Sequence, residues 1–252
     1  MRMFSFRFSI VLVLICAPIL KAQELPEWQN LSVVTQNTES PRSTFYVYDS
    51  EEEAVENEYY KSENLLLLNG TWKFNLSDTP EQRPEAFYKS DYNTTDWDDI
   101  KVPGDWQMQG YDFPLYVSAG YTHRINPPFV DTIYNPVGSY KREFILPEDW
   151  NDKQIKLYFG GVTSAFYVWI NGQKVGYDED AKTPSEFDIT SFVKSGNNEI
   201  AVEVYRWSDG TYLEDQDFWR LSGIERDVYV YAQPKAHIQD FFFKAGLDTE
   251  YI

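Results

Sequence analysis

Short strand-like runs of apolar residues follow one another through the centre of the chain. They cover residues 66–76, 140–146, 154–159, 166–170, 174–177, 199–207 and 227–231. Several alternate apolar with polar side chains, which is the period-two pattern of a half-buried strand. Asn171-Gly172, between two of these runs, is a strong signal for a hairpin turn.

The stretches between these runs carry turn signals. Asn69-Gly70 predicts a turn or bulge inside the first run. Residues 78–100 predict a long loop or a short helix that buries Phe87, Tyr88 and Trp97, and residues 187–192 predict a short helical or turn segment. Because no long segment has the period of a helix, the pattern predicts an all-β fold, a sandwich or jelly roll.

The first 22 residues differ from the rest of the chain. Arg2 and Arg7 precede an apolar run over 8–15, and Ala22 provides a small residue before a cleavage point. This pattern predicts a secretory signal peptide over 1–22 and an exported protein, periplasmic or secreted. The run is short for a transmembrane helix. The alternatives are a buried N-terminal helix and a lipid-modified Cys16, although Ile15 is bulky where a lipoprotein has a small residue.

Three further segments follow from composition along the chain. Residues 23–58 are polar and acidic, and we expect a solvated arm or strap. Residues 59–233 hold the strand-like runs, and Pro234 marks a boundary. Residues 234–252 contain an apolar run at 237–244 that predicts the first strand of another unit. Because one strand cannot bury its apolar face alone, we expect the chain to be the front part of a longer protein.

Composition and charge exclude several classes of protein. The chain has 252 residues, and its 42% hydrophobic and 17% aromatic content excludes disorder. Its formal charge of −18 becomes −21 once the three basic residues of 1–22 are removed, which argues against binding nucleic acid or an anionic membrane. A single Cys permits no internal disulfide, and no Cys/His cluster has zinc-site spacing.

Three segments combine aromatic and polar residues more densely than core strands do. They cover residues 102–112, 126–140 and 206–224. Aromatic faces stack on the C–H faces of sugar rings, and carboxylates accept hydrogen bonds from hydroxyls. Trp219 close to Asp217 has the composition of such a site, although a core Trp with a capping Asp explains one such pair equally simply.

The order of these motifs resembles a known family. They include Asn-Gly-Thr-Trp at 69–72, Pro-Ser-Glu-Phe-Asp at 184–188, Glu-Asp-Gln-Asp-Phe-Trp at 214–219 and Ser-Gly-Ile-Glu-Arg-Asp-Val at 222–228. From about Leu68 to Gln233, the chain resembles the N-terminal sugar-binding domain of bacterial β-galactosidases of glycoside hydrolase family 2. The resemblance implies a jelly-roll sandwich, then an immunoglobulin-like domain that begins in 234–252, then a barrel that holds both catalytic carboxylates. No catalytic residue is then expected in this chain.

The resemblance also implies roles for individual residues. It places Asp217 where the family binds galactose hydroxyls and a monovalent cation such as sodium, with Trp219 beside it as a substrate-binding residue. Ser118 stands where the family has an Asn that contacts the sugar, and its side chain is shorter. Asp209 and Glu179 match positions where family members can hold a divalent cation such as magnesium, while the alternative is that both are solvated acids. No organic cofactor is implied.

The resemblance therefore implies the sugar-binding portion of a retaining β-galactosidase that hydrolyses terminal non-reducing β-D-galactose residues. Its partners would be a β-galactoside, the remaining domains of the enzyme, and other copies in a homo-oligomer of the complete protein. We expect this chain alone to be inactive. Two alternatives remain: a free-standing carbohydrate-binding module without catalysis, and an enzyme of the same family that acts on a glucuronide or a mannoside.

Overall fold

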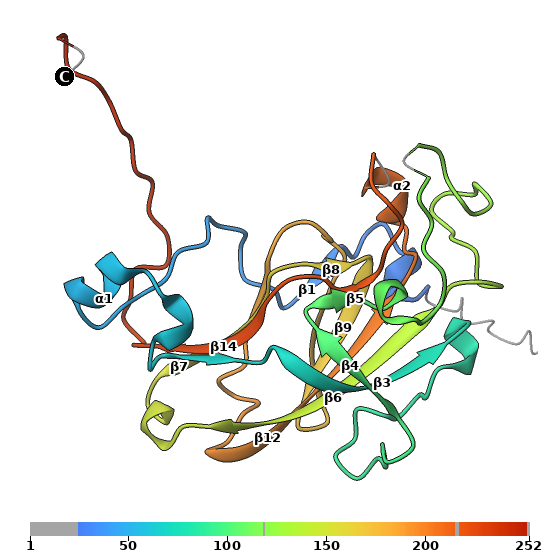
Figure 1. Ribbon diagram of the computed structural model, residues 1–252, viewed down its shortest axis with the longest axis horizontal. Helices are drawn as coiled ribbons and strands as arrows, with labels where there is room; N and C mark the ends of the chain where they lie inside the picture. Colours follow the sequence, from blue (N-terminus) through green and yellow to red (C-terminus); the bar gives the residue numbers. More distant parts are fainter. Residues whose placement is uncertain (1–24, 118, 215–216, 251–252) are drawn as a thin grey trace, which may run out of the picture.

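Two facing antiparallel sheets form the body of the molecule (Figure 1). The structure is a computed structural model that describes residues 25–117, 119–214 and 217–250. A seven-stranded sheet has the order β1-β10-β9-β12-β6-β3-β4, and a four-stranded sheet has the order β11-β7-β14-β2. A small third sheet, β5-β13-β8, lies at one end. The predicted all-β jelly-roll sandwich is confirmed.

The strands are short and the helices shorter still. The strands are β1 (Thr35–Gln36), β2 (Leu65–Leu67), β3 (Gly70–Ser77), β4 (Asp98–Val102), β5 (Gly104–Asp105), β6 (Val137–Leu146), β7 (Gln154–Phe159), β8 (Val162–Thr163), β9 (Ala165–Ile170), β10 (Gln173–Asp178), β11 (Ser185–Asp188), β12 (Gly196–Tyr205), β13 (Gly223–Ile224) and β14 (Val228–Gln233). The α-helices are α1 (Glu51–Glu56) and α2 (Thr211–Glu214), and single 3₁₀ turns cover Glu27–Gln29, Tyr59–Lys61, Pro80–Gln82, Gln107–Gln109 and Glu148–Trp150.

The seven-stranded sheet is covered on both of its faces. Along β9, Phe166, Val168 and Ile170 belong to the core between the two sheets, whereas Tyr167 and Trp169 belong to a second apolar cluster. All six residues of β9 are buried. A strand buried on both faces loses the alternation of apolar and polar residues. This is why β9 is a continuous apolar run in the sequence.

Most predicted strands are confirmed, but the segments over 187–192, 98–100 and 237–244 differ from the prediction. Residues 187–192 were expected to form a helical or turn segment, but Phe187 and Asp188 belong to β11, which pairs with β7. The turn begins only afterwards, where the backbone N–H groups of Phe192 and Val193 donate to the carbonyl of Ile189. Four strand residues are too few to show a period, so only the turn chemistry was visible in the sequence.

The segment predicted as a loop over 78–100 is a loop only to residue 97, because Asp98–Val102 forms β4, and the loop lies on the outer face of the seven-stranded sheet. Phe87 is fully buried, while Tyr88 and Trp97 are partly buried against the same apolar cluster. The ring of Tyr88 stacks on Trp169 of β9 with 5.0 Å between centroids. Aromatic pairs in this geometry stabilise beyond the area that they bury.

The acidic arm runs along the sandwich as a strap, and among its described residues only Trp28 and Gln29 are buried. Trp28 is 5% exposed and stacks on Tyr205, with 5.0 Å between centroids. β1 then pairs with β10 at the edge of the seven-stranded sheet. Directly after it, Thr38 bridges to Phe187 at the edge of the four-stranded sheet. The arm therefore passes from one sheet to the other.

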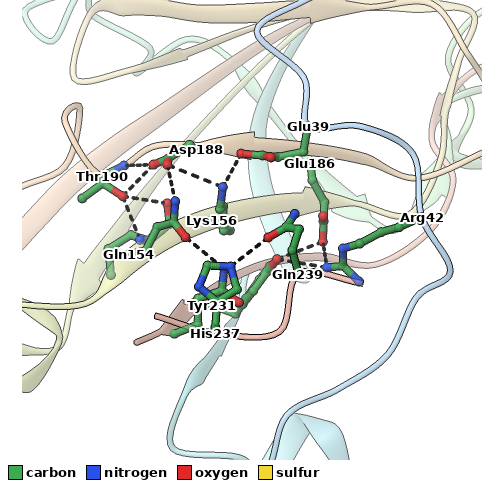
Figure 2. A network of polar contacts seen from close by, with 12 residues as sticks. Glu39, Arg42, Gln154, Lys156, Glu186, Asp188, Thr190, Tyr231, His237 and Gln239 are labelled. Carbon is green, nitrogen blue, oxygen red and sulfur yellow. Dashed lines mark hydrogen bonds and ion pairs between the residues drawn. The ribbon is translucent and has the colours of Figure 1, made fainter. Parts of the chain in front are cut away.

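The arm continues across the outer face of the four-stranded sheet through ionic contacts (Figure 2). Lys156, only 2% exposed, forms an ion pair with Glu39. Arg42 pairs with Glu186 at 2.7 Å. In the most acidic part of the arm, α1 is exposed along its whole length, and its first turn is capped by the hydroxyl of Ser50.

The tail over 234–250 forms no strand in the part of the chain that the structure describes, so the strand predicted at 237–244 is absent. Phe242 and Phe243 are 83% and 80% exposed. A strand requires a neighbour for its hydrogen bonds, and no described residue pairs with the tail as a sheet neighbour. Figure 1 shows the tail leaving the sandwich beyond β14. Whether a new domain begins at 234 stays a prediction.

Two predictions lie outside the described residues, namely the signal peptide over 1–22 and the side chain of Ser118. Among the residues described, no helix has the length and apolar character that a membrane span requires.

Candidate functional site

Two long loops meet at one end of the sandwich, and both were predicted to carry recognition. One loop runs from β5 to β6, and the other, which contains α2, runs from β12 to β13. Leu115 and Arg220 form an isolated bridge between the loops. The ring of Tyr121 lies 5.1 Å from Tyr212. Figure 1 shows α2 beside the green loop, in agreement with these contacts.

A buried ion pair joins the bases of the two loops. The side chains of Arg206 and Asp112 are 0% and 1% exposed, and their guanidinium and carboxylate groups are in contact. The Arg206 Nη2 donates to the carbonyl oxygens of Phe113 and Arg220, both at 3.3 Å. A buried arginine that is paired and hydrogen-bonded in this way is costly to disrupt. It therefore determines how the two loops lie relative to each other.

Asp217 and Trp219 are presented at the surface of the second loop. Asp217 has a φ of 44°, in the left-handed region, and its side chain is exposed. Trp219 is 61% exposed, and its ring lies edge-on to Tyr116 with 5.1 Å between centroids. A capped core tryptophan, the plainer interpretation of this pair, is therefore wrong. The pair has the exposed aromatic face and carboxylate that a sugar contact requires.

A hollow of about 390 Å³ adjoins this pair. Phe218, Trp219, Lys182 and Glu214 are among the residues that line it. The ammonium of Lys182 lies 5.1 Å from the centroid of the Phe218 ring. Burial raises the pKa of Glu214 to about 7. The hollow thus combines aromatic faces with hydrogen-bonding groups.

Glu179 and Asp209 come together in a second, buried site. They are 6% and 2% exposed, and the hydroxyl of Tyr177 donates to Glu179 at 2.6 Å. Burial raises the pKa of Glu179 to about 8, and the neighbouring charge of Asp209 adds to this effect. Both carboxylate oxygens of Asp209 are buried, and neither has a hydrogen-bond partner among the described residues. The prediction that these two acids are simply solvated is wrong.

The arm closes over this acid pair. The backbone N–H of Asp209 donates to the carbonyl of Trp28 at 3.0 Å. The preceding residue, Glu27, accepts hydrogen bonds from Tyr167 at 2.8 Å and Lys174 at 2.9 Å. Burial alone would raise the pKa of Glu27, but these hydrogen bonds lower it to about 2. Acids with opposite pKa shifts therefore lie near each other at this end of the arm.

Sequence reasoning missed the residues that position both sites. Arg206 and Asp112 are 94 residues apart, and Glu27 and Tyr167 are 140 apart. No local pattern links such partners, because the sheet topology alone brings them together. The one available signal was Arg206 beside Trp207 at the end of a strand, where a charged residue next to apolar ones suggests a buried pair.

The carboxylates of Glu179 and Asp209 are the candidate ligands for a divalent cation. No group of three or more His, Cys, Asp or Glu side chains among the described residues is arranged to hold a metal ion. Glu179 and Asp209 provide two carboxylates, and Asp209 keeps its buried oxygens without partners. Hard oxygen ligands suit magnesium or sodium, and backbone carbonyls or water complete many such sites. The pair fits a cation that carbonyl groups or water help to hold.

Comparison with known proteins identifies the family. Residues 65–234 match the model of the sugar binding domain of glycosyl hydrolases family 2, so the chain belongs to that family. It is 46% identical over 235 residues to a beta-galactosidase of Priestia megaterium, and the match covers 91% of this chain. It is 41% identical to a beta-galactosidase of Psychromonas ingrahamii, with 92% of this chain covered. The matches span only 23% and 22% of those two proteins.

Solved structures support the fold. A beta-glucuronidase of Bacteroides uniformis is 27% identical with a TM-score of 0.52, and the match covers 68% of this chain and 18% of that one. A beta-glucuronidase of an uncultured Clostridium species has the same TM-score at 24% identity, with 68% and 29% covered. The two-sheet sandwich is thus shared with beta-glucuronidases.

Proposed function

We propose that this chain is the sugar-binding portion of a retaining β-galactosidase that hydrolyses terminal non-reducing β-D-galactose residues. The observation that carries the proposal is the 46% identity to a beta-galactosidase over 91% of the chain. The exposed pair of Asp217 and Trp219 supports it, because an exposed carboxylate and aromatic face suit a hydroxyl-rich ring.

The two catalytic carboxylates are proposed to lie in the remainder of the enzyme. Retaining hydrolysis requires an acid/base and a nucleophile about 5–5.5 Å apart on opposite sides of the bond that breaks. Glu179 and Asp209 are adjacent but buried beneath the arm, so no substrate reaches them in this arrangement. Asp217 is therefore assigned to binding, where its carboxylate accepts hydrogen bonds from galactose hydroxyls and helps to hold a sodium ion.

The direct experiment measures aryl-β-galactoside hydrolysis by the purified 252-residue chain and by the longer protein that contains it. We expect turnover only in the longer protein. Turnover by the chain alone would overturn the assignment of catalysis to other domains. Tight galactoside binding by the chain, with no hydrolysis in the longer protein, would instead favour a carbohydrate-binding module without catalysis.

Asp217→Ala in the longer protein tests the site. Removing an acceptor of substrate hydroxyls should cost roughly 1–3 kcal/mol in transition-state binding, measured as kcat/KM. Asp180→Ala is a matched control on another loop, and it should leave kcat/KM unchanged. An unchanged kcat/KM for Asp217→Ala would remove this residue from the site.

A magnesium ion at Glu179 and Asp209 is the second part of the proposal. The buried carboxylate oxygens of Asp209, which have no partner among the described residues, support it. When bound, the ion would neutralise the two acids and stabilise the closure of the arm. Added magnesium should raise the melting temperature of the wild-type chain but not of Asp209→Asn. Equal shifts in both proteins would contradict the site.

Export is proposed from the pattern of residues 1–22, with cleavage after Ala22. Mass spectrometry of the protein recovered from culture medium or periplasm tests this directly, because a cleaved chain begins at Gln23.

A further inference from the structure

We propose that the outer face of the four-stranded sheet carries a second binding site, for a neutral saccharide, that is separate from the loops around Asp217. A hollow opens there, with a volume of about 560 Å³ when the open solvent at its mouth is included. Its walls come from the arm, the 3₁₀ turn Tyr59–Lys61, β14 and the first residues of the tail. Figure 1 shows β14 and β7 on the side of α1, away from α2.

Tyrosines form the apolar walls of the hollow. Tyr46 of the arm stacks on Tyr59 with 4.2 Å between centroids and 11° between planes. Tyr229 of β14 lies 6.4 Å from Tyr46 and 6.3 Å from Tyr59. Tyr46 and Tyr59 are partly exposed, so the outer side of their stack offers an apolar surface to a ligand, whereas Tyr229 is 3% exposed and stacks on Tyr158.

The charged residues of the hollow, Arg42 and Glu186, form an ion pair. Arg42 Nη2 lies 2.7 Å from Glu186 Oε1, and the hydroxyl of Tyr231 donates to the same carboxylate oxygen at 3.0 Å. Figure 2 shows Arg42 extending to Glu186 and Tyr231. The Arg42 Nε is buried and has no hydrogen-bond partner among the described residues. The charged groups of the hollow are therefore paired with each other and leave it without net charge.

Amide side chains complete the rim. Gln233 at the end of β14 and Gln239 in the tail both line the hollow. His237 lies between them, with its Nε2 at 3.0 Å from Gln233 Nε2 and 2.8 Å from Gln239 Oε1. Amides provide both donors and acceptors without charge. The tail thus contributes hydrogen-bonding groups to one side of the opening.

The charge of the hollow indicates which ligand it fits. The chain has 40 acidic residues, yet Arg42 and Glu186 are the only charged residues among those that line the hollow, and they neutralise each other. An ionic ligand would find no net opposite charge there. A ligand with one apolar face and hydroxyl edges matches tyrosine walls and an amide rim. A pyranose ring has this form, with C–H groups on its face and hydroxyls at its edge.

Much of this hollow lies outside the segment that matches the family model. Arg42, Tyr46, Tyr59 and Gln239 are outside residues 65–234. The hollow exists because the arm crosses the sheet and the tail leaves beside it. It is therefore a feature of this chain's arm and tail, independent of the Asp217 loop.

The experiment is saturation-transfer NMR and calorimetry on the purified chain with methyl β-D-galactopyranoside and methyl β-D-glucopyranoside. We expect binding of at least one glycoside, weakened at least about tenfold by Tyr46→Ala and about three- to tenfold by Gln239→Ala. Phe242→Ala is the control, because Phe242 is 83% exposed in the tail and does not line the hollow. It should leave the affinity unchanged.

The outcome distinguishes this site from the proposed function. Trp219→Ala removes an aromatic face of the loop site and should not affect binding in the hollow. If Trp219→Ala abolishes all binding while Tyr46→Ala and Gln239→Ala do not weaken it, the sugar binds only at the loops. The proposal of a saccharide site in the hollow is then overturned. If neither glycoside binds the chain, the proposed saccharide site in the hollow is likewise overturned, while the assignment of Asp217 in the longer protein is unaffected. The melting temperature of each variant confirms that it is folded, and Gln239→Ala changes an exposed residue whose loss leaves the core intact.

Discussion

The arm over 23–58 and the tail over 234–250 are both polar or mixed segments at the edges of the sandwich, but they behave differently. The arm buries Trp28, adds β1 to a sheet and pairs its charges with Lys156 and Glu186. The tail leaves Phe242 and Phe243 in solvent and joins no sheet. The arm is acidic and the tail is aromatic, so hydrophobicity does not explain the difference. The difference depends on whether the segment meets a sheet edge, an apolar cluster or charged partners along its path.

The largest test of this comparison is Trp28→Ala. Removing a buried indole that stacks on Tyr205 should lower the free energy of unfolding by about 3–5 kcal/mol. Leu31→Ala, at a position that is 66% exposed in the same arm, is the control and should change it by less than about 0.5 kcal/mol. Equal effects in chemical denaturation would mean that the arm does not depend on its buried tryptophan.

Arg42→Ala should have the next largest effect. It leaves Glu186 without its ion-pair partner in a site where both side chains are about nine-tenths buried, and we expect a loss of about 2–3 kcal/mol. The double variant Arg42→Met with Glu186→Gln should recover most of this loss, because it leaves no charge without a partner. A double variant as unstable as the single one would show that packing, not charge, holds this part of the arm.

The acid pair beneath the arm gives a pH-dependent effect. The pKa of Glu179 is raised to about 8, so between pH 5 and 8 the native state keeps a proton that the unfolded state has released. Stability should therefore fall as the pH rises through this window, and level off above it. The fall should be roughly 1–3 kcal/mol larger in the wild-type chain than in Glu179→Gln. Parallel denaturation curves for both proteins across this range would contradict the raised pKa.

The smallest effect is expected in the tail. The double variant Phe242→Ser with Phe243→Ser should change the free energy of unfolding by less than about 0.5 kcal/mol, because both side chains are more than three-quarters exposed. It should also reduce self-association in light scattering, since exposed aromatic groups promote aggregation. A large loss of stability would mean that the tail packs on the sandwich in solution.

Sequence patterns predicted the fold better than they predicted the site. Period-two runs located β3, β6, β7 and β12, and Asn171-Gly172 located the hairpin between β9 and β10. They missed β11 and most of β4, because strands of four and five residues carry no readable period. They also placed a strand in the tail, where the pattern is suitable but no neighbour is present among the described residues.

For the site, the motif around residue 217 indicated an exposed carboxylate and indole, and the structure presents both at the surface. The sequence did not reveal that Arg206 and Asp112 join the two loops, or that Glu27 and Trp28 close over the acid pair. These contacts join residues far apart in the chain, so only the path of the sheets determines them.

The sequence by itself determined the all-β class, the positions of the longer strands and the family, because alternation, turn residues and ordered motifs are local properties of the chain. The tertiary structure decided which acids are buried, which aromatic residues stay exposed, and which terminal segment joins a sheet. Those outcomes depend on desolvation and on partners supplied by distant residues. Glu179 and Asp217 are both acids in polar surroundings in the sequence, yet one is buried beneath the arm and the other lies in solvent.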